Sequence, residues 1–215
     1  MSVKAGAKGV TKPEKAAENS SFFSGSDVVT IARSLIGKHL YSHVDGEVTG
    51  GIIIETEAYC ERSDLAMKKH LKRRPSSIET LKRRGGIAYI YTVYGHHSLF
   101  NIVTNNEGHA DSVLVRAIEP TTGIDVMVSR RNGNDQKRNL CSGPAKLTQA
   151  LAITPKFNGV PIPINRIPIS QNSEKPVWIE NSGESIPYSQ IKVTPRIGID
   201  YAEEDAKLPW RFKLV

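Results

Sequence analysis

Residues 51–59 read Gly-Ile-Ile-Ile-Glu-Thr-Glu-Ala-Tyr, and this stretch constrains the fold more than any other part of the chain. Three consecutive isoleucines favour the pleated surface of a β-sheet, so we expect a strand here. Because side chains alternate along a strand, one face should hold Ile53, Glu55, Glu57 and Tyr59. The other face should be core, formed by Ile52, Ile54 and Ala58. Two carboxylates and a phenol at the end of an apolar strand indicate either a pocket wall or a half-exposed end that pairs with basic residues.

Runs of β-branched and aromatic residues outnumber helical patterns, and most of them arrive as hairpins. The Asp45-Gly46 pair is a strong two-residue hairpin signal. We therefore predict an α+β fold in a single domain, with a mixed, largely antiparallel β-sheet and flanking helices. The expected strands cover residues 40–44, 47–59, 87–94, 99–104, 112–118, 177–180, 191–199 and 210–214.

Three helices are expected beside this sheet. Ser26 and Asp27 are suited to cap a helix over 28–35. Pro120 is suited to the first position of a second helix that runs to Arg131. Ser142-Gly143-Pro144 should cap the third, and with Lys146 this helix start could also seat a phosphate group.

The chain has 215 residues, which suits one domain with a sizeable core, expected over residues 21–215. Residues 1–20 are rich in Lys, Ala, Gly and polar residues and predict a disordered basic tail. This segment lacks the apolar centre of a secretory signal, and no apolar run approaches the length of a membrane span. These features predict an intracellular protein without membrane association.

The net charge is +7, from 29 Lys and Arg against 22 Asp and Glu, and the isoelectric point is near 9.4. This excess favours a polyanionic partner, nucleic acid before a membrane surface. Cys60 and Cys141 lie far apart, so two free thiols are expected, with a single disulfide as the alternative. No Cys/His cluster has the spacing of a zinc site, and no metal is expected.

A strongly basic segment covers residues 62–84, with nine Lys or Arg against Asp64 and Glu79. Its apolar periodicity is weak, so we expect a long surface loop with a turn or two of helix. Such a loop could follow a phosphate backbone, or it could simply be a solvated charged loop.

Two further residues stand out beside the expected strands. Arg116 lies in the apolar run 113–118. Because an unpaired buried charge is costly, Arg116 should pair with a carboxylate or phosphate, and Glu55 and Glu57 are the natural partners. Tyr94 follows a strand and precedes Gly95, which predicts a protruding side chain or an ordinary strand aromatic.

Several segments together resemble the alkyladenine (3-methyladenine) DNA glycosylase family, from about Ser26 to the C-terminus. Their order and spacing match, which one short motif alone would not establish. The segments are Ile54-Glu55-Thr56-Glu57-Ala58-Tyr59, Tyr89-Ile90-Tyr91-Thr92-Val93-Tyr94-Gly95, Asn101, Val113-Leu114-Val115-Arg116-Ala117-Ile118-Glu119-Pro120 and Ser142-Gly143-Pro144-Ala145-Lys146-Leu147.

The resemblance implies a monofunctional enzyme of base excision repair that binds double-stranded DNA as a monomer and needs no cofactor. Such enzymes flip a damaged purine out of the duplex and hydrolyse its N-glycosidic bond. By matching position, Glu57 would be the general base that activates water, and Arg116 would hold that water and the carboxylate. The expected substrates are purines of the 3-methyladenine, hypoxanthine and ethenoadenine class. The site of action would be the cytoplasm or nucleoid of a bacterium, or the nucleus of a eukaryote.

The same matching positions imply a base pocket. Tyr59 and Tyr91 would sandwich the flipped base, with Leu114 lining the pocket. Asn101, at the floor, would exclude the 2-amino group of guanine. Tyr94 would intercalate in the duplex to fill the vacated space. The DNA backbone would be contacted by His96, Lys146, Arg73 and Arg74.

The chain departs from the family at one pocket position. Where family members carry a His, this sequence has Lys68, with His70 two residues further on. A Lys ammonium cannot accept a hydrogen bond, and it repels a cationic base. Three outcomes are open: His70 occupies the place, the enzyme prefers neutral lesions, or the pocket has changed its role.

Two other functions compete with the glycosylase interpretation. The first is a non-catalytic or re-purposed nucleic-acid-binding relative with an altered pocket loop. The second is a two-carboxylate glycosidase that uses Glu55 and Glu57, which would lie about 6.5–7 Å apart at the backbone. A zinc nucleobase deaminase is excluded, because its His-x-Glu and Pro-Cys-x-x-Cys motifs are missing.

Overall fold

The structure is a computed structural model that describes residues 22–24, 27–133, 137–164, 176–181 and 186–215. The expected tail over 1–20 and the capping residue Ser26 lie outside the described residues. The strands are β1 (His39–Val44), β2 (Glu47–Tyr59), β3 (Ala88–Val93), β4 (His97–Thr104), β5 (Asp111–Thr122), β6 (Val177–Glu180), β7 (Ile191–Thr194) and β8 (Arg211–Leu214). The α-helices are α2 (Val28–Ser34), α3 (Leu65–Arg73), α4 (Ser77–Leu81), α5 (Ile124–Arg130) and α6 (Pro144–Ala150). The 3₁₀ segments are η1 (Lys137–Asn139), η2 (Pro155–Phe157), η4 (Tyr188–Gln190) and η5 (Asp200–Lys207).

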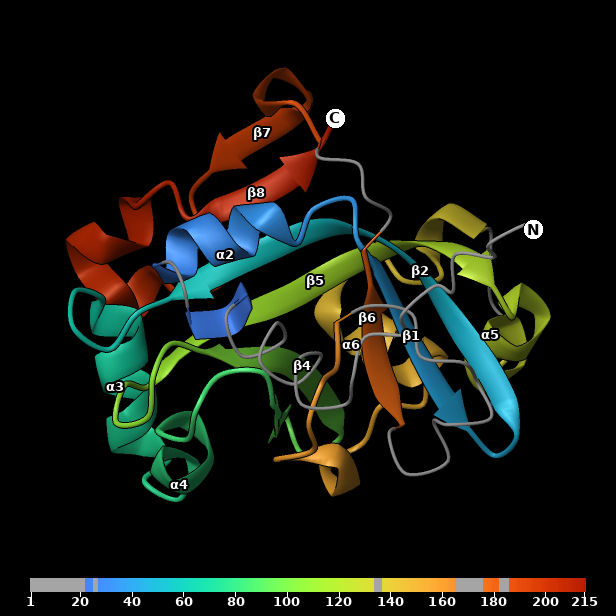
Figure 1. Ribbon diagram of the computed structural model, residues 1–215, viewed down its shortest axis with the longest axis horizontal. Coiled ribbons are helices and arrows are strands. Elements are labelled where there is room, and N and C mark those ends of the chain that lie inside the picture. The colour runs from blue at the N-terminus through green and yellow to red at the C-terminus, as the bar shows by residue number, and fades with distance from the viewer. Residues whose placement is uncertain (1–21, 25–26, 134–136, 165–175, 182–185) are drawn as a thin grey trace, which may run out of the picture.

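The strands form one eight-stranded sheet in the order β3-β4-β5-β2-β1-β6, with β8 pairing with both β2 and β7. Neighbouring strands pair antiparallel, which confirms the predicted α+β class. The long strand β2 connects three neighbours, β1, β5 and β8. Figure 1 shows α2 lying along β2 and β5, and α3 and α4 grouped at the end of the sheet where β2 stops.

The β1–β2 hairpin turns at the predicted Asp45-Gly46 pair, whose φ angles of 56° and 80° are both left-handed. The simple alternation expected along β2 is wrong at one point. The pairing of β2 with β5 shifts between Ile53 and Glu55, so Ile53 changes face. Ile53, Thr56 and Ala58 are buried in the core, and the Thr56 hydroxyl donates to the Ala32 carbonyl of α2 at 2.8 Å. A bulge adds one residue to a strand, which reverses the alternation beyond it.

The α2 helix is capped by Asp27, whose carboxylate accepts from the Val29 and Thr30 amides. Two other predicted boundaries are wrong. Pro120 does not begin a helix, because it continues β5 opposite Gly51, and α5 begins only after Gly123, whose φ is 66°. The last long strand expected over 191–199 stops at Thr194, because Pro195 has no amide hydrogen to continue the ladder.

The basic segment 62–84 is also different from the predicted loop. It forms two helices, α3 and α4, separated by a turn at Pro75. Asp64 caps α3 by accepting from the Ala66 amide at 2.9 Å. The buried face of these helices is formed by Ala66, Met67, Leu71 and Leu81. The apolar residues are too few to dominate the sequence pattern, since Lys and Arg occupy the exposed positions between them.

Candidate active site

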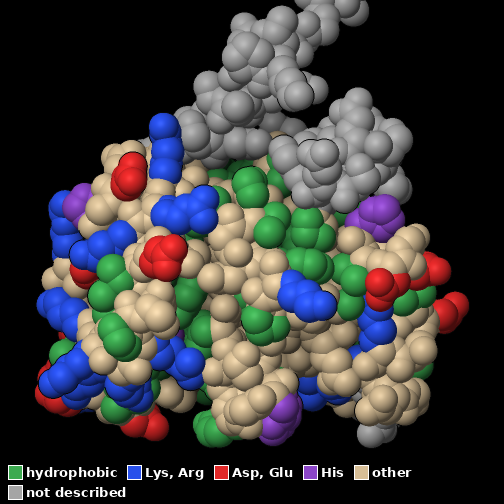
Figure 2. Space-filling view, turned by 90° about the horizontal axis from the view of Figure 1, so that it is seen from below, with side chains coloured by type: hydrophobic (Ala, Val, Ile, Leu, Met, Phe, Trp, Pro, Cys, Tyr) green, Lys and Arg blue, Asp and Glu red, His purple; other side chains and the backbone are tan. Residues whose placement is uncertain are grey.

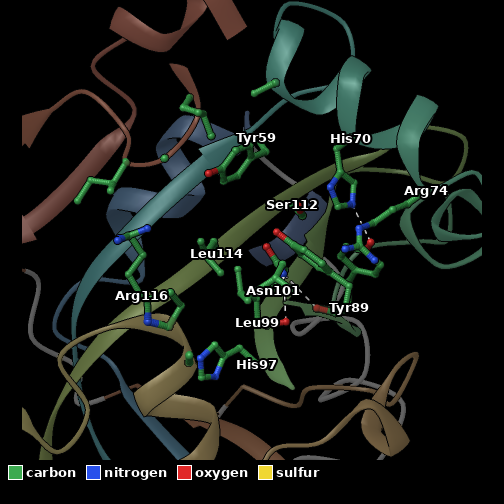
Figure 3. A pocket seen from close by; sticks show the side chains of 18 of the residues that line it. Tyr59, His70, Arg74, Tyr89, His97, Leu99, Asn101, Ser112, Leu114 and Arg116 are labelled. Atoms are coloured by element: carbon green, nitrogen blue, oxygen red, sulfur yellow. Dashed lines mark hydrogen bonds between the residues drawn. The ribbon is translucent and has the colours of Figure 1, made fainter. Parts of the chain in front are cut away.

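A cavity of about 970 Å³ opens at the end of the sheet where β2 stops. Its walls come from α3, the strands β3, β4 and β5, the start of α6 and the segment 197–201. Figure 3 shows Tyr59, His70, Tyr89, Asn101 and Arg116 arranged around it. Segments far apart in the sequence therefore converge on one pocket at the end of β2, which is the first of the two alternatives for this strand end.

The Glu57 carboxylate lies directly behind this wall and is 0% exposed. Its Oε2 accepts a hydrogen bond from the Tyr59 hydroxyl at 2.7 Å. Its Oε1 accepts from the Ile197 amide at 2.8 Å and lies 3.3 Å from Arg116 Nη1. The carboxylate is thus held by two hydrogen bonds and one ion pair, from three segments of the chain.

Glu55 and Arg116 form the neighbouring part of the site. Arg116 Nε donates to Glu55 Oε1 at 2.8 Å, and Arg211 Nε donates to the same oxygen at 2.7 Å. Burial alone would raise the pKa of Glu55, but the hydrogen bonds from Arg211 and Arg116 lower it below its ordinary value. Burial opposes the charge of Arg116, but Glu57 and Glu55 raise its pKa. Arg116 is therefore paired with both predicted carboxylates, while Arg211 was not predicted.

A second buried ion pair supports the site. Both terminal nitrogens of Arg196 donate to the Asp64 carboxylate, at 2.6 and 2.8 Å, and both side chains are 0% exposed. The Arg196 guanidinium also lies 4.7 Å from the Tyr59 ring centroid and donates to the Ala58 carbonyl at 2.8 Å. The next residue, Ile197, supplies the amide that contacts Glu57.

Sequence reasoning missed Arg196 and Asp64. The signal was present, because Arg196 sits between Val193 and Ile199 in a stretch of apolar residues, as Arg116 does in its own strand. An Arg in such a place needs a buried partner. The partner could not be found from the sequence, since Asp64 lies in the segment expected to be a surface loop.

Aromatic rings form two sides of the cavity. Tyr59 lies at the end of β2 and Tyr91 lies on β3, and both line the cavity. Burial, then the neighbouring Glu57 carboxylate, raises the pKa of Tyr59 well above its ordinary value, which keeps its hydroxyl a donor. The Tyr91 ring stacks on Tyr89, with 5.4 Å between centroids. The two predicted sandwich residues therefore both line the pocket.

His70, and not Lys68, faces this pocket. The His70 ring lies 4.8 Å from the Tyr91 centroid, and its Nε2 is 2.7 Å from the Tyr89 hydroxyl. Burial, then the charges of Arg74 and Arg73, lowers the pKa of His70 to about 4. The Lys68 side chain is exposed and lies outside the cavity wall, because two residues along a helix correspond to roughly 200° of rotation.

The floor of the cavity is formed by β4 and β5. Asn101 is buried, and its Nδ2 is held by the carbonyls of Tyr89 and Leu99 at 3.3 and 3.4 Å. Leu114 lies opposite Asn101 in the pairing of β4 with β5, and both line the cavity as expected. The amide hydrogens of Asn101 are thus engaged by the backbone.

Tyr94 occupies the tip of the β3–β4 hairpin and is 88% exposed. It has a left-handed φ of 51°, followed by Gly95 at 77°. A tyrosine in this conformation carries local strain. The adjacent His96 is also exposed, and its Nδ1 lies 2.7 Å from the Tyr94 carbonyl. The structure therefore places the expected protruding aromatic at the rim of the cavity.

The four residues expected at the DNA backbone have different environments. His96 and Arg73 are exposed, whereas Lys146 and Arg74 are partly buried. Arg73, Arg74 and Lys146 line the cavity. Arg73 stacks over Tyr201, with 4.1 Å to the ring centroid. Figure 2 shows Lys and Arg side chains gathered on the left of this face, the side of α3 and α4. Within the basic segment 62–84, the exposed Lys and Arg side chains are those of Arg62, Lys68, Lys72, Arg73, Arg83 and Arg84.

With this geometry in place, comparison with known proteins identifies the chain's relatives. The family pattern described as Methylpurine-DNA glycosylase (MPG) matches residues 21–215. The chain belongs to the methylpurine-DNA glycosylase family. The match spans every element around the cavity, from α2 to β8.

Relatives from several bacteria cover nearly the whole chain. A Chlamydia felis protein named "Putative 3-methyladenine DNA glycosylase" is 44% identical over 195 residues, 90% of this chain and 94% of the relative. A Bacillus cereus protein of the same name is 39% identical over 199 residues, 89% of this chain and 92% of the relative. One from Natranaerobius thermophilus is 35% identical over 191 residues, 88% of this chain and 91% of the relative.

Membership of the methylpurine-DNA glycosylase family supports a DNA N-glycosylase of base excision repair that acts on damaged DNA. Cys60 and Cys141 do not form a disulfide, as predicted. In the described part of the chain, no helix is long and apolar enough to cross a membrane. No three His, Cys, Asp or Glu side chains among the described residues group as metal ligands.

Proposed function

We propose that this glycosylase flips a damaged purine out of duplex DNA and hydrolyses its N-glycosidic bond with a water molecule activated by Glu57. The observation that carries this proposal is the position of the Glu57 carboxylate. It is buried behind the wall of an open cavity and is held by the Tyr59 hydroxyl, the Ile197 amide and Arg116. A carboxylate that is held by specific partners beside a cleft is a candidate functional group.

The proposed reaction needs one carboxylate and one water. The bond between the sugar C1′ and the purine nitrogen breaks, and its electron pair leaves with the base. Glu57 stabilises the oxocarbenium-like sugar and accepts a proton as the water oxygen bonds to C1′. Arg116 orients this water, since its guanidinium reaches both Glu57 and Glu55. General-base assistance of this kind contributes about 10²–10⁴-fold to the rate.

The cavity provides the other parts of the proposed binding mode. The flipped purine lies between Tyr59 and Tyr91, where stacking contributes roughly 1–3 kcal/mol per base. Asn101 and Leu114 contact its edge at the floor and exclude the 2-amino group of guanine. The exposed Tyr94 enters the duplex in place of the flipped nucleotide. The substrates on this proposal are purines of the 3-methyladenine, hypoxanthine and ethenoadenine class.

The basic surface beside the cavity supports double-stranded DNA as the partner of a monomeric enzyme inside the cell. The basic segment 62–84 carries exposed Lys and Arg side chains, and its Arg73 and Arg74 line the cavity together with Tyr94 of the β3–β4 hairpin. This surface and Lys146 would contact phosphates on both sides of the flipped nucleotide. The site of action would be the cytoplasm or nucleoid of a bacterium, or the nucleus of a eukaryote. The tail over 1–20 would add only salt-sensitive affinity to the domain over 21–215.

The deciding experiment measures base release from duplex oligonucleotides that carry hypoxanthine, 1,N6-ethenoadenine or 3-methyladenine. Abasic sites are revealed with alkali, and wild type is compared with Glu57→Gln. Glu55→Gln is the matched control, because Glu55 lies on the same strand and pairs with Arg116 and Arg211. We expect release by wild type, loss of at least 100-fold in Glu57→Gln, and a smaller loss in Glu55→Gln.

Two other results would replace this proposal. If wild type binds these duplexes but releases no base, the protein is a nucleic-acid-binding relative. If both carboxylate variants lose activity equally, a two-carboxylate mechanism is favoured. Borohydride trapping checks the monofunctional mechanism, since a covalent adduct at Lys146 would show an amine nucleophile in place of water.

A further inference from the structure

The cavity wall is rich in cations and poor in anions. Arg73, Arg74, Arg116 and Lys146 line it, and no Asp or Glu does so among the described residues. Glu57 lies behind the wall, but it is fully buried and already paired with Arg116. A base that enters this cavity therefore meets positive charge that no acidic lining residue balances.

Arg74 is built into the wall of the base pocket by two contacts. Its Nη2 donates to the Thr92 carbonyl at 2.8 Å, and its guanidinium lies 5.0 Å from the Tyr91 ring centroid. The side chain is partly buried, so it forms part of the wall (Figure 3). These contacts distinguish it from Arg83, which is exposed on the same basic segment.

Arg74 and Arg116 differ in whether a carboxylate pairs with the guanidinium. Arg116 contacts two carboxylates, those of Glu55 and Glu57. No ion pair holds Arg74 within the part of the chain that the structure describes. A cation over an aromatic ring also draws on the electron density that would otherwise attract a second cation.

We propose that Arg74 makes this pocket select neutral purine lesions over cationic ones. This inference rests on the proposed function, in which Tyr91 stacks on the flipped base. Hypoxanthine and 1,N6-ethenoadenine are neutral, whereas purines alkylated at N3 or N7 of the nucleoside carry a positive charge. A cationic base stacked on Tyr91 would be repelled at close range by the fixed guanidinium, and the partly desolvated wall screens this repulsion less than water does.

The test compares rates of base release on two duplexes, one with hypoxanthine and one with 7-methylguanine as the cationic lesion. Wild type is measured beside Arg74→Met and Arg74→Gln, because Gln retains a donor for the Thr92 carbonyl. Arg83→Met is the matched control for loss of one positive charge from the same segment. Each lesion loses its base at its own intrinsic rate. This difference cancels when the ratio of the two release rates in a variant is divided by the same ratio in wild type.

We expect both Arg74 variants to shift the ratio toward 7-methylguanine by about tenfold, as one unit charge near the ring implies. Arg83→Met should leave the ratio unchanged. Equal losses on both lesions, or an unchanged ratio in both Arg74 variants, would overturn the inference while leaving the proposed function intact. Release of neither lesion by wild type would instead overturn the proposed function, and the inference with it.

Discussion

The hydroxyl of Tyr59 donates a 2.7 Å hydrogen bond to the carboxylate of Glu57, two residues earlier on β2. The same tyrosine lines the cavity, while the carboxylate is buried behind it. The side chain proposed to stack on the substrate therefore also positions the side chain proposed to activate water. Binding and chemistry are linked here through a single residue.

Tyr59→Phe separates these two roles. We expect the rate of base release to fall roughly ten- to thirty-fold, because one hydrogen bond to a charged group is lost. Affinity for a duplex with an abasic-site analogue opposite thymine should be retained. Tyr59→Ala should lose activity more severely, since stacking is lost as well. Single-turnover kinetics measures this, and a Tyr59→Phe rate equal to wild type would show that the hydrogen bond is unimportant.

Asp64→Asn should strongly destabilise the fold. The Asp64 carboxylate is 0% exposed and holds both terminal nitrogens of Arg196, which would remain buried without a counter-charge. Breaking such a pair costs about 3–5 kcal/mol in the free energy of unfolding. Urea denaturation measures this value. Glu204→Gln is the control, because its ion pair with Lys207 is exposed and should have no measurable effect.

Tyr94→Asn should make the protein more stable and less active on duplex DNA. Asn tolerates the left-handed φ of 51° better than Tyr, so the free energy of unfolding should rise by about 1 kcal/mol. Base release from duplex DNA should fall, because the wedge is lost, while release from a single-stranded oligonucleotide should change little. Thermal denaturation and the duplex to single-strand activity ratio test both halves. A variant that is less stable, or that keeps the wild-type ratio, would contradict the assigned role.

The lowered pKa of His70 predicts that the stability of the protein depends on pH. Its pKa is lowered in the folded protein from 6.5 to about 4, chiefly by burial. Between these values the unfolded chain binds more protons, so this residue makes stability decrease as pH falls through the window. His70→Phe should flatten the decrease by up to about 1 kcal/mol per pH unit. Urea denaturation between pH 7 and pH 5 checks this, and parallel curves for both proteins would refute it.

The residues that face the pocket from the strands could largely be predicted from the sequence. Period-two alternation and the apolar surroundings of Arg116 predict its ion pairs with Glu55 and Glu57, and the structure has both. The expected alternation along β2 failed where one extra residue in the strand reverses which side chains face the core. The bulge near Ile54 leaves no mark in composition, and it reverses which isoleucine is buried.

The α3 wall of the site could be predicted only in part, because the sequence left open whether His70 takes the place that counting gives to Lys68. Counting positions from the family motif selected Lys68, but the helix turns that side chain to solvent and brings His70 and Arg74 into the cavity. The helix itself is stabilised by tertiary contacts, such as the Asp64 pair with Arg196 from the other end of the chain. No short window of sequence contains both partners.

The pairing of β2 on both edges has a consequence for local opening of the molecule. Residues 55–57 pair with β5 on one side and β8 on the other, so their amide hydrogens should exchange with solvent only when the whole fold opens. The α3 helix lies outside the sheet, so we expect its amide hydrogens to exchange through an opening of lower free energy. The α3 wall of the pocket could then adjust to the base that enters, while β2, which carries the proposed catalytic carboxylate, stays rigid.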